Sequence, residues 1–115
     1  MLLVEDDPDM RDMLSLMLEL QGARVITAAN GVEAYNLART YAPCLIILDL
    51  MMPVMTGEEF RKVQLAHHGL RRIPVVVVSA HYDAAVIAKR MKARAYFPKP
   101  VELDSLSAFV AKICK

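Results

Sequence analysis

The stretch CLIILDLMMPVMTG, residues 44–57, carries the clearest structural information in the chain. Its first part, residues 44–48, is a continuous aliphatic run with no polar alternation, and residues 75–78 form another. Strands of this kind are buried on both faces, as in parallel sheets that are covered by helices. We therefore predict a parallel sheet that contains these two runs as buried strands.

Shorter apolar runs predict three further strands, at residues 2–4, 24–27 and 95–97. The segments between successive strands carry apolar residues at helical spacing. Right-handed crossovers between parallel strands place helices on both faces of a sheet. We predict a (βα)5 doubly wound five-stranded parallel sheet, a flavodoxin-like three-layer α/β sandwich, with residues 1–115 as a single domain.

Capping residues mark where several of the helices are expected to begin. Asp7 precedes a proline, which is a favoured first helical residue. Asn30 stands three residues before Glu33 in the pattern of a capping box, and Asp83 is expected to cap the fourth helix. The third helix is predicted over residues 58–66.

The composition of the chain excludes several classes of protein. With 56% hydrophobic and 23% charged residues, there is enough apolar material for a core, which excludes intrinsic disorder. A net charge of +1 gives no support for direct nucleic-acid binding, and no apolar run approaches the roughly 20 residues of a membrane-spanning helix. The acidic start MLLVEDDPDM is unlike a signal peptide. We expect a cytoplasmic protein with no membrane contact.

The two cysteines, Cys44 and Cys114, lie far apart in different kinds of segment. The chain contains no CxxC motif and no histidine cluster near either of them, so neither a disulfide framework nor a zinc site is indicated. Free cysteine commonly behaves as a small buried hydrophobe. We expect both to be reduced thiols.

Polar residues follow four of the predicted strands, at the points where the strands end. In a doubly wound sheet these carboxyl ends meet at one edge, which is where such folds bind ligands. The residues are Glu5, Asp6 and Asp7 after the first strand, Asp49 after the third, Ser79 after the fourth, and Lys99 after the fifth.

Such a cluster of carboxylates restricts the chemistry of the site. Two like charges about 4 Å apart repel by roughly 4 kcal/mol at an effective dielectric constant near 20. The carboxylates must therefore take up protons or bind a cation. Oxygen ligands at a half-open site suit Mg²⁺, which often accompanies phosphate, and Lys99 adds a fixed positive charge. The sequence thus predicts a site for a phosphoryl group beside a metal ion.

Four motifs in this order resemble the response-regulator receiver domains of two-component signalling, in the chemotaxis-regulator-like superfamily. They are LLVEDD, LIILDLMMPVMTG, VVVVSA and YFPKP, and together with the five strand–helix units they span essentially the whole chain. The resemblance implies a phosphorelay signal receiver rather than an enzyme: a phosphoacceptor domain that assists its own phosphorylation and dephosphorylation.

The resemblance assigns a role to each site residue. Asp49 would be the phosphoacceptor, attacking the phosphorus of a phosphohistidine to give an acyl phosphate. Ser79 and Lys99 would bind the phosphoryl oxygens, Pro100 would follow a cis peptide bond, and Gly57 would let the chain turn into the third helix. The Mg²⁺ ligands would be Glu5, Asp6, Asp49 and the backbone carbonyl of Met51.

The resemblance also implies a conformational switch and a set of partners. After phosphorylation, Ser79 and Tyr96 would move and alter the surface formed by helix 4, strand 5 and helix 5. The phosphodonor would be a sensor histidine kinase or a His-phosphotransfer protein. The altered surface would act on a downstream effector domain or protein, and it is a candidate face for a homodimer.

Four positions depart from what the family usually shows. One is Pro98, which stiffens the loop that carries the Lys99 ammonium and gives PKP rather than a freer dipeptide. Lys92 stands where a glycine commonly ends the fourth helix, so that turn needs a different C-cap. Met51 and His81 stand beside the site where polar residues are common. Met51 cannot orient an attacking water molecule, whereas the imidazole of His81 can, which leaves the lifetime of the phosphoryl group open.

Two other functions are compatible with parts of the sequence. The first is a degenerate receiver that acts only as a docking or dimerisation module, against which the full set of site residues argues. The second is a phosphatase of the haloacid-dehalogenase type with an aspartate nucleophile. Such enzymes need a second aspartate two residues after the nucleophile, and here that position is Met51.

Overall fold

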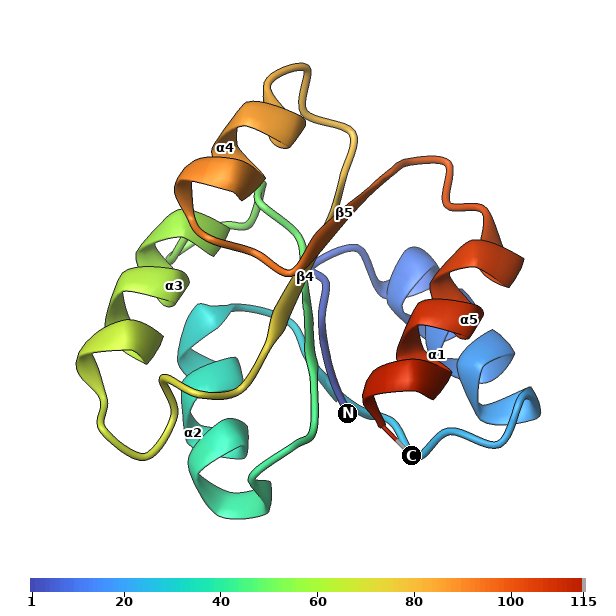
Figure 1. The fold of residues 1–115 in the computed structure, drawn as a ribbon, viewed down its shortest axis with the longest axis horizontal. Coiled ribbons are helices and arrows are strands. Elements are labelled where there is room, and N and C mark those ends of the chain that lie inside the picture. Colours follow the sequence, from blue (N-terminus) through green and yellow to red (C-terminus); the bar gives the residue numbers. More distant parts are fainter. Residues whose placement is uncertain (115) are drawn as a thin grey trace.

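The computed structural model describes residues 1–114 and contains one sheet with helices on both faces (Figure 1). Strands and helices alternate along the chain from the first strand to the last helix. Their bounds are β1 Leu2–Val4, α1 Pro8–Leu20, β2 Ile26–Ala28, α2 Gly31–Tyr41, β3 Ile46–Leu48, α3 Gly57–Ala66, β4 Val75–Ser79, α4 Ala84–Arg90, β5 Ala95–Pro98 and α5 Leu103–Ile113.

The sheet has the strand order β2-β1-β3-β4-β5, and every neighbouring pair is parallel. Helices α1 and α5 cover one face, while α2, α3 and α4 cover the other (Figure 1). The core accordingly divides into two buried clusters, one on each side of the sheet. The predicted doubly wound α/β sandwich is confirmed. No helix within residues 1–114 is long and apolar enough to cross a membrane.

The strands follow the predicted aliphatic runs, with shifts at their ends. β3 and β4 are buried along their whole length, as the absence of polar alternation predicted. β2 begins two residues later than expected, at Ile26, and β5 extends to Pro98. A proline is tolerated there because β5 is the outermost strand of the sheet, where its missing N–H costs no ladder hydrogen bond.

The capping predictions have mixed outcomes. The side chain of Asp7 accepts a hydrogen bond from the Asp9 N–H, and that of Asn30 accepts one from the Glu33 N–H, as expected for N-caps. Asp83 occupies the N-cap position of α4, but its side chain accepts no capping hydrogen bond within residues 1–114. That expectation was wrong: the backbone N–H of Asp83 instead donates to the ring of His81.

The third helix begins one residue earlier than predicted because a complete capping box precedes it. The Thr56 hydroxyl accepts from the Glu59 N–H at 3.2 Å, and the Glu59 carboxylate accepts from the Thr56 N–H at 3.1 Å. The spacing Thr-x-x-Glu is the sequence pattern of this motif, so the helix start was readable from the sequence.

The end of α4 shows how the chain manages without a glycine. Lys92 adopts the left-handed conformation that a glycine would favour, with φ of 58°. The buried guanidinium of Arg61 in α3 donates to the carbonyls of Met91 and Lys92, at 3.0 and 3.2 Å. It also donates to Gln64, whose amide donates to carbonyls in the α3–β4 connection. A side chain of the neighbouring helix therefore satisfies carbonyls that follow α4.

The two cysteines are joined, contrary to expectation. Cys44 and Cys114 form a disulfide that closes a sequence separation of 70 residues, with their Cα atoms 5.6 Å apart. The prediction of two reduced thiols rested on sequence distance and on the absence of a paired motif. Topology overrides both arguments, because the connection before β3 and the end of α5 lie at the same end of the sheet.

Candidate functional site

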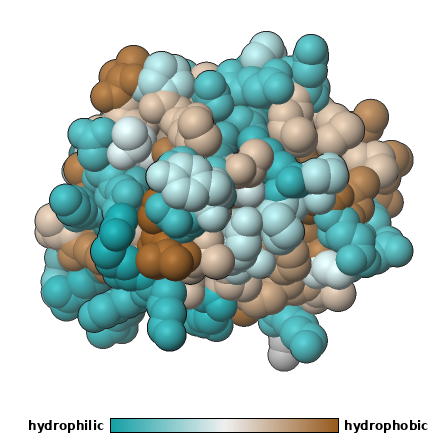
Figure 2. Space-filling model, turned by 90° about the horizontal axis from the view of Figure 1, so that it is seen from above, coloured by the Kyte–Doolittle hydropathy of each residue, from teal (hydrophilic) through white to brown (hydrophobic). Residues whose placement is uncertain are grey.

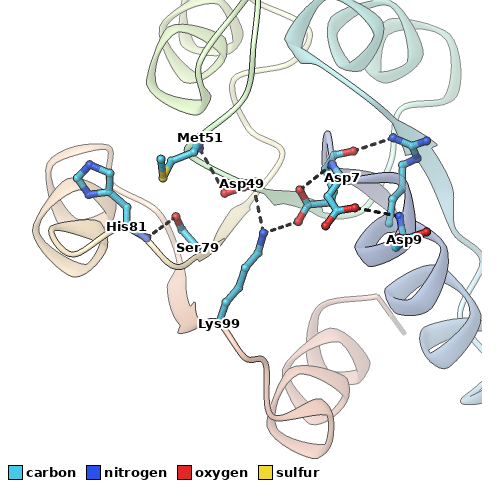
Figure 3. Close-up of polar contacts among 9 residues, drawn as sticks. Asp7, Asp9, Asp49, Met51, Ser79, His81 and Lys99 are labelled. Carbon is cyan, nitrogen blue, oxygen red and sulfur yellow. Dashed lines mark hydrogen bonds and ion pairs between the residues drawn. The ribbon is translucent and has the colours of Figure 1, made fainter.

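The candidate site lies at the carboxyl ends of β1 and β3, the two strands between which the order of the sheet reverses (Figures 1 and 3). The Glu5 N–H donates to the Ala28 carbonyl and the Asp49 N–H donates to the Val4 carbonyl. These bonds continue the sheet ladder by one residue. They hold the backbones of Glu5 and Asp49 beside each other at the position where doubly wound folds bind ligands.

Three of the predicted acidic residues are gathered there. Glu5, Asp6 and Asp49 each offer a carboxylate oxygen, and these oxygens lie within 4.8 Å of one another. Glu5 and Asp49 are almost inaccessible to solvent, with 2% and 5% of their surfaces exposed, whereas Asp6 is half-buried. Asp7, the fourth acidic residue of this region, caps α1 instead. The arrangement is a compact cluster of negative charge that is open on the Asp6 side.

Lys99 brings a positive charge to two of these carboxylates. Its Nζ atom donates to Glu5 Oε1 at 2.5 Å and to Asp49 Oδ2 at 3.2 Å (Figure 3). Only 16% of its side chain is exposed, so solvent screens these contacts less than it screens a surface ion pair. Lys99 follows β5. Its backbone N–H donates to the carbonyl of Ser79 at the end of β4, and this bond fixes the start of the loop that carries Lys99.

Burial and charge shift the pKa values of this pair. Burial, reinforced by the neighbouring Asp49, raises the pKa of Glu5 to about 7, although the hydrogen bond from Lys99 opposes the shift. Burial alone would lower the pKa of Lys99, but the contacts with Glu5 and Asp49 raise it above its ordinary value. Lys99 is therefore a permanent cation, while Glu5 exchanges a proton near neutral pH.

Neighbouring groups hold both the carboxylate and the backbone of Glu5. Its Oε2 atom accepts from the Asp7 N–H at 3.3 Å, and its own backbone carbonyl accepts from the guanidinium of Arg11 at 3.0 Å. No role for Arg11 in this region was predicted from the sequence. Its spacing places it one helical turn after the N-cap Asp7, which brings it back over the β1–α1 connection.

The Asp49 carboxylate is held from both sides. Oδ1 accepts from the Met51 N–H at 3.3 Å, while Oδ2 accepts from Lys99. The Met51 side chain points away and is 59% exposed. Gly57 is required here for a different reason from the one expected. A Cβ atom at Gly57 would lie 2.5 Å from the Asp49 carbonyl oxygen, and its φ is not left-handed, so close backbone approach excludes a side chain.

Ser79 is fully buried at the end of β4, and its Oγ atom accepts a hydrogen bond from the His81 N–H at 3.1 Å. Because the oxygen acts as acceptor in this contact, the hydroxyl proton is free for another partner. The ring of His81 accepts from the Asp83 N–H through Nδ1 and stacks on Tyr82 with 4.7 Å between ring centroids. The imidazole is thereby oriented by both neighbours.

A cavity of about 510 Å³ adjoins the acidic cluster. It lies between the β3–α3 and β4–α4 connections, and its walls include Asp6, Met51 and His81. Figure 2 looks down on this end of the molecule and shows hydrophobic side chains in separate patches among hydrophilic ones. Val54 in the β3–α3 connection is 83% exposed and has a φ of 69°, which is a strained conformation for a β-branched residue.

The remaining predicted residues lie on β5 and just beyond it. Tyr96 pairs with Val77 across the β4–β5 ladder and is half-buried against the core cluster on the α2–α4 side. The Lys99–Pro100 peptide bond is cis. Tyr96 thus lies on the strand that leads to Lys99, two strands from β3, which precedes Asp49, and three strands from β1, which precedes Glu5.

Comparison with known proteins gives a consistent result. The sequence model of a family described as "Response regulator receiver domain" matches residues 1–111. The transcriptional regulatory protein AfsQ1 of Streptomyces coelicolor is 34% identical over 118 residues, a match covering all of this chain and 51% of that protein. Protein PilH of Pseudomonas aeruginosa is 33% identical over 107 residues, covering 91% of this chain and 88% of that one.

Solved structures agree with the sequence relatives. The Vibrio cholerae chemotaxis protein CheY4 superposes with a TM-score of 0.87 at 30% identity, covering 97% of this chain and 95% of that one. The Francisella response regulator 1452 receiver domain gives a TM-score of 0.86 at 25% identity, covering 97% and 93%. The chain spans about half of AfsQ1 and 24% of the Escherichia coli regulatory protein AtoC, so those relatives contain further sequence outside the matched part.

Proposed function

Because this chain belongs to the response regulator receiver domain family, we propose that it is a phosphorelay receiver in which Asp49 accepts a phosphoryl group from a phosphohistidine. One observation supports this assignment above the others. Asp49 is a buried carboxylate at the end of a central strand, and the Lys99 ammonium contacts it at 3.2 Å. An anion paired with a fixed cation in this way suits a site that takes up further negative charge.

In the proposed phosphoryl transfer, one bond to phosphorus forms and one breaks. A carboxylate oxygen of Asp49 forms the new bond to phosphorus, the bond from phosphorus to the histidine nitrogen breaks, and the electron pair of that bond stays on the imidazole. Lys99 donates to a phosphoryl oxygen, and the free hydroxyl proton of Ser79 donates to another. Glu5, which shares Lys99 with Asp49 before transfer, keeps the ammonium in position.

The acidic cluster fits Mg²⁺. The three carboxylates supply hard oxygen ligands within 4.8 Å of one another, and the half-buried Asp6 keeps one side accessible to water, as Mg²⁺ prefers. Asp6 and Asp49 would bind the ion directly, with the Met51 backbone carbonyl as a further ligand and Glu5 acting through a bound water. When bound, Mg²⁺ neutralises the charge on the phosphoryl oxygens.

The response to phosphorylation is proposed to pass through Ser79 and Tyr96. Ser79 is drawn toward the phosphoryl oxygens, Tyr96 rotates inward from its half-buried position, and the α4–β5–α5 surface changes. This surface would act on a downstream effector and is the proposed face for a homodimer. The phosphodonor would be a histidine kinase or a His-phosphotransfer protein in the cytoplasm, and residues 1–115 would act as one receiver unit.

The two alternative functions fit the geometry less well. A docking module without phosphotransfer has no need for Lys99 to pair with a buried Asp49. A phosphatase of the haloacid-dehalogenase type needs an acid/base carboxylate two residues after the nucleophile, and the side chain there is the exposed thioether of Met51.

The proposal is tested with a small-molecule phosphodonor and Mg²⁺, followed by intact mass measurement. We expect the mass of one phosphoryl group, stable in acid and labile in base, that disappears when Mg²⁺ is chelated. Asp49→Asn should abolish the gain, and Asp12→Asn, the same change on the exposed face of α1, should leave it intact. An unmodified mass for the folded wild-type chain would contradict the phosphoacceptor assignment.

A further inference from the structure

The Cys44–Cys114 bond joins two segments that the proposed phosphoryl chemistry does not use. Cys44 lies in the connection before β3, and Cys114 follows α5. Their Cα atoms are 5.6 Å apart, within the separation that a disulfide spans without backbone movement. The pair lies at the opposite end of the sheet from Asp49, beyond the amino end of the same strand β3.

The bond is accessible to reagents in solution. Cys44 is an exposed residue and Cys114 is half-buried. Both line an open groove of about 700 Å³ between the ends of α1 and α5, a volume large enough for a small thiol. Structural disulfides are usually protected from thiol reagents by burial, whereas exposed ones exchange readily. Accessibility therefore indicates a pair that changes its redox state in the folded protein.

The anchoring of α5 does not depend on this bond. Leu106 and Val110 are buried in the core cluster on the α1–α5 side, and the ring of Phe109 packs edge-on against Phe97 of β5. Beyond Val110, the Cys114 N–H donates to the Val110 carbonyl, and the half-buried Ile113 also packs against this cluster. Breaking the disulfide would thus loosen the last turn of α5, where the core contact of Ile113 is only half-buried, and leave the rest of the helix docked.

The two cysteines have different chemical surroundings. The thiolate is the reactive form of cysteine, and nearby cations stabilise it. Arg24 and Lys112 line the groove that both cysteines share, so the cations favour a thiolate at either one. Cys114 follows the C-terminal end of α5, where the helix dipole is negative and disfavours an anion. Because Cys44 is more exposed and does not lie at a helix C-terminus, we assign it as the thiol that attacks first and Cys114 as the thiol that resolves the intermediate.

We propose that Cys44 and Cys114 are a reversible redox modification site that fixes or releases the last turn of α5. In the oxidation, the Cys44 thiolate attacks a low-molecular-weight disulfide such as oxidised glutathione and expels one thiolate. The Cys114 thiolate then attacks the sulfur of Cys44 in the mixed disulfide and expels the second. Two protein thiols lose two electrons and two protons, and one glutathione disulfide becomes two thiols. A dithiol reductant reverses the reaction.

The first test follows the redox state of the full chain. The folded protein is equilibrated with oxidised glutathione or with dithiothreitol, its free thiols are trapped by alkylation, and its mass is measured. We expect no alkyl groups after oxidation and two after reduction, with native circular dichroism in both states. In Cys114→Ser, oxidised glutathione should leave one glutathione on Cys44, whereas Cys44→Ser should react several-fold more slowly.

The second test asks whether the bond controls α5. Backbone hydrogen exchange is compared between the oxidised and reduced wild-type chain, so that no variant has to fold. We expect amides of residues 111–114 to exchange at least ~10-fold faster after reduction, and amides of residues 106–109 to change by less than ~2-fold. Two alkyl groups after oxidation, resistance of the folded protein to dithiothreitol, or equal exchange in both states would each overturn the proposal.

Discussion

The first residue of α3, Gly57, lies directly against the backbone of Asp49. A Cβ atom at Gly57 would be 2.5 Å from the Asp49 carbonyl oxygen and 2.9 Å from the Leu50 Cα. The Gly57 N–H donates to the Leu50 carbonyl, which holds the helix start and the strand end together. The backbone that carries the proposed phosphoacceptor is thus positioned by a residue with no side chain.

Substituting Gly57 with alanine should therefore displace Asp49. The methyl group meets backbone atoms that cannot rotate away, so we expect Gly57→Ala to lower the free energy of unfolding by about 1–3 kcal/mol. It should also slow phosphorylation by a small-molecule donor. Gly69→Ala is the matched control. A Cβ atom at Gly69 would have its nearest neighbour in the His67 ring, at 3.3 Å, which is a side chain and not backbone. Urea denaturation and intact mass measure both effects. Equal stability and equal phosphorylation of the two variants would contradict the packing argument.

The raised pKa of Glu5 predicts the direction of a pH effect on stability. Its pKa is about 7 in the folded protein and near 4.5 in an ordinary setting, so the folded state holds a proton that the unfolded state releases between these values. The free energy of unfolding should therefore fall as pH rises through this window, by at most about 1.4 kcal/mol per pH unit for one proton.

Urea denaturation in a metal-free buffer checks this effect. The stability of the wild-type chain should fall more steeply between pH 5 and pH 8 than that of Glu5→Gln, since other titrating groups are common to both. Added Mg²⁺ should stabilise the wild-type chain more at pH 8 than at pH 5, because protons compete with the ion for carboxylate oxygens. Parallel pH profiles for the two proteins would show that Glu5 does not titrate in this window.

The strained backbone at Val54 predicts a stabilising substitution. Left-handed conformations cost a non-glycine residue about 1–2 kcal/mol, and asparagine tolerates them better than a β-branched residue does. We expect Val54→Asn to raise the free energy of unfolding by about 1 kcal/mol. Val32→Asn, at an exposed position within α2, should give no gain. Thermal unfolding of the two variants decides the matter, and a loss of stability in Val54→Asn would refute the assignment of strain.

The guanidinium of Arg61 predicts a large loss of stability when it is removed. Arg61→Ala leaves the carbonyls of Met91 and Lys92 and the side chain of Gln64 without their donor, so we expect a loss of about 2–4 kcal/mol. Arg72→Ala removes an exposed guanidinium and should change stability by less than about 0.5 kcal/mol. Chemical denaturation compares the two. A similar small loss in both variants would mean that water replaces the lost hydrogen bonds.

The fold was predictable because its determinants are local. The runs at residues 44–48 and 75–78 lack polar alternation, and that pattern is enough to predict buried parallel strands. The location of the candidate site could be predicted from the same strands, since the topology brings the residues at the ends of β1, β3, β4 and β5 to one edge of the sheet. Asp7 and Asn30 cap their helices by contacts within three residues, which a sequence pattern can encode.

Contacts between distant segments were not predictable in this way. The Cys44–Cys114 bond spans 70 residues, and the donors of Arg61 reach carbonyls 30 and 31 residues away. The residues in these contacts do not stand at a recognisable sequence spacing, because the contacts depend on how α3, α4 and α5 pack. The function of Gly57 was also misassigned. Whether a glycine serves a turn or a close approach depends on the atoms beside it, which only the structure shows.

The short outer strand β5 has a consequence for how the sheet avoids edge-to-edge pairing with strands of other chains. It covers β4, whose run of four valines would otherwise present an unpaired, strongly β-forming edge to other chains. β5 ends at Pro98, which offers no N–H for a further ladder, and the charged Arg94 and Lys99 flank it. Such features make an edge a poor template for another strand. A variant that loosened β5 would expose the edge of this valine-rich strand to other chains.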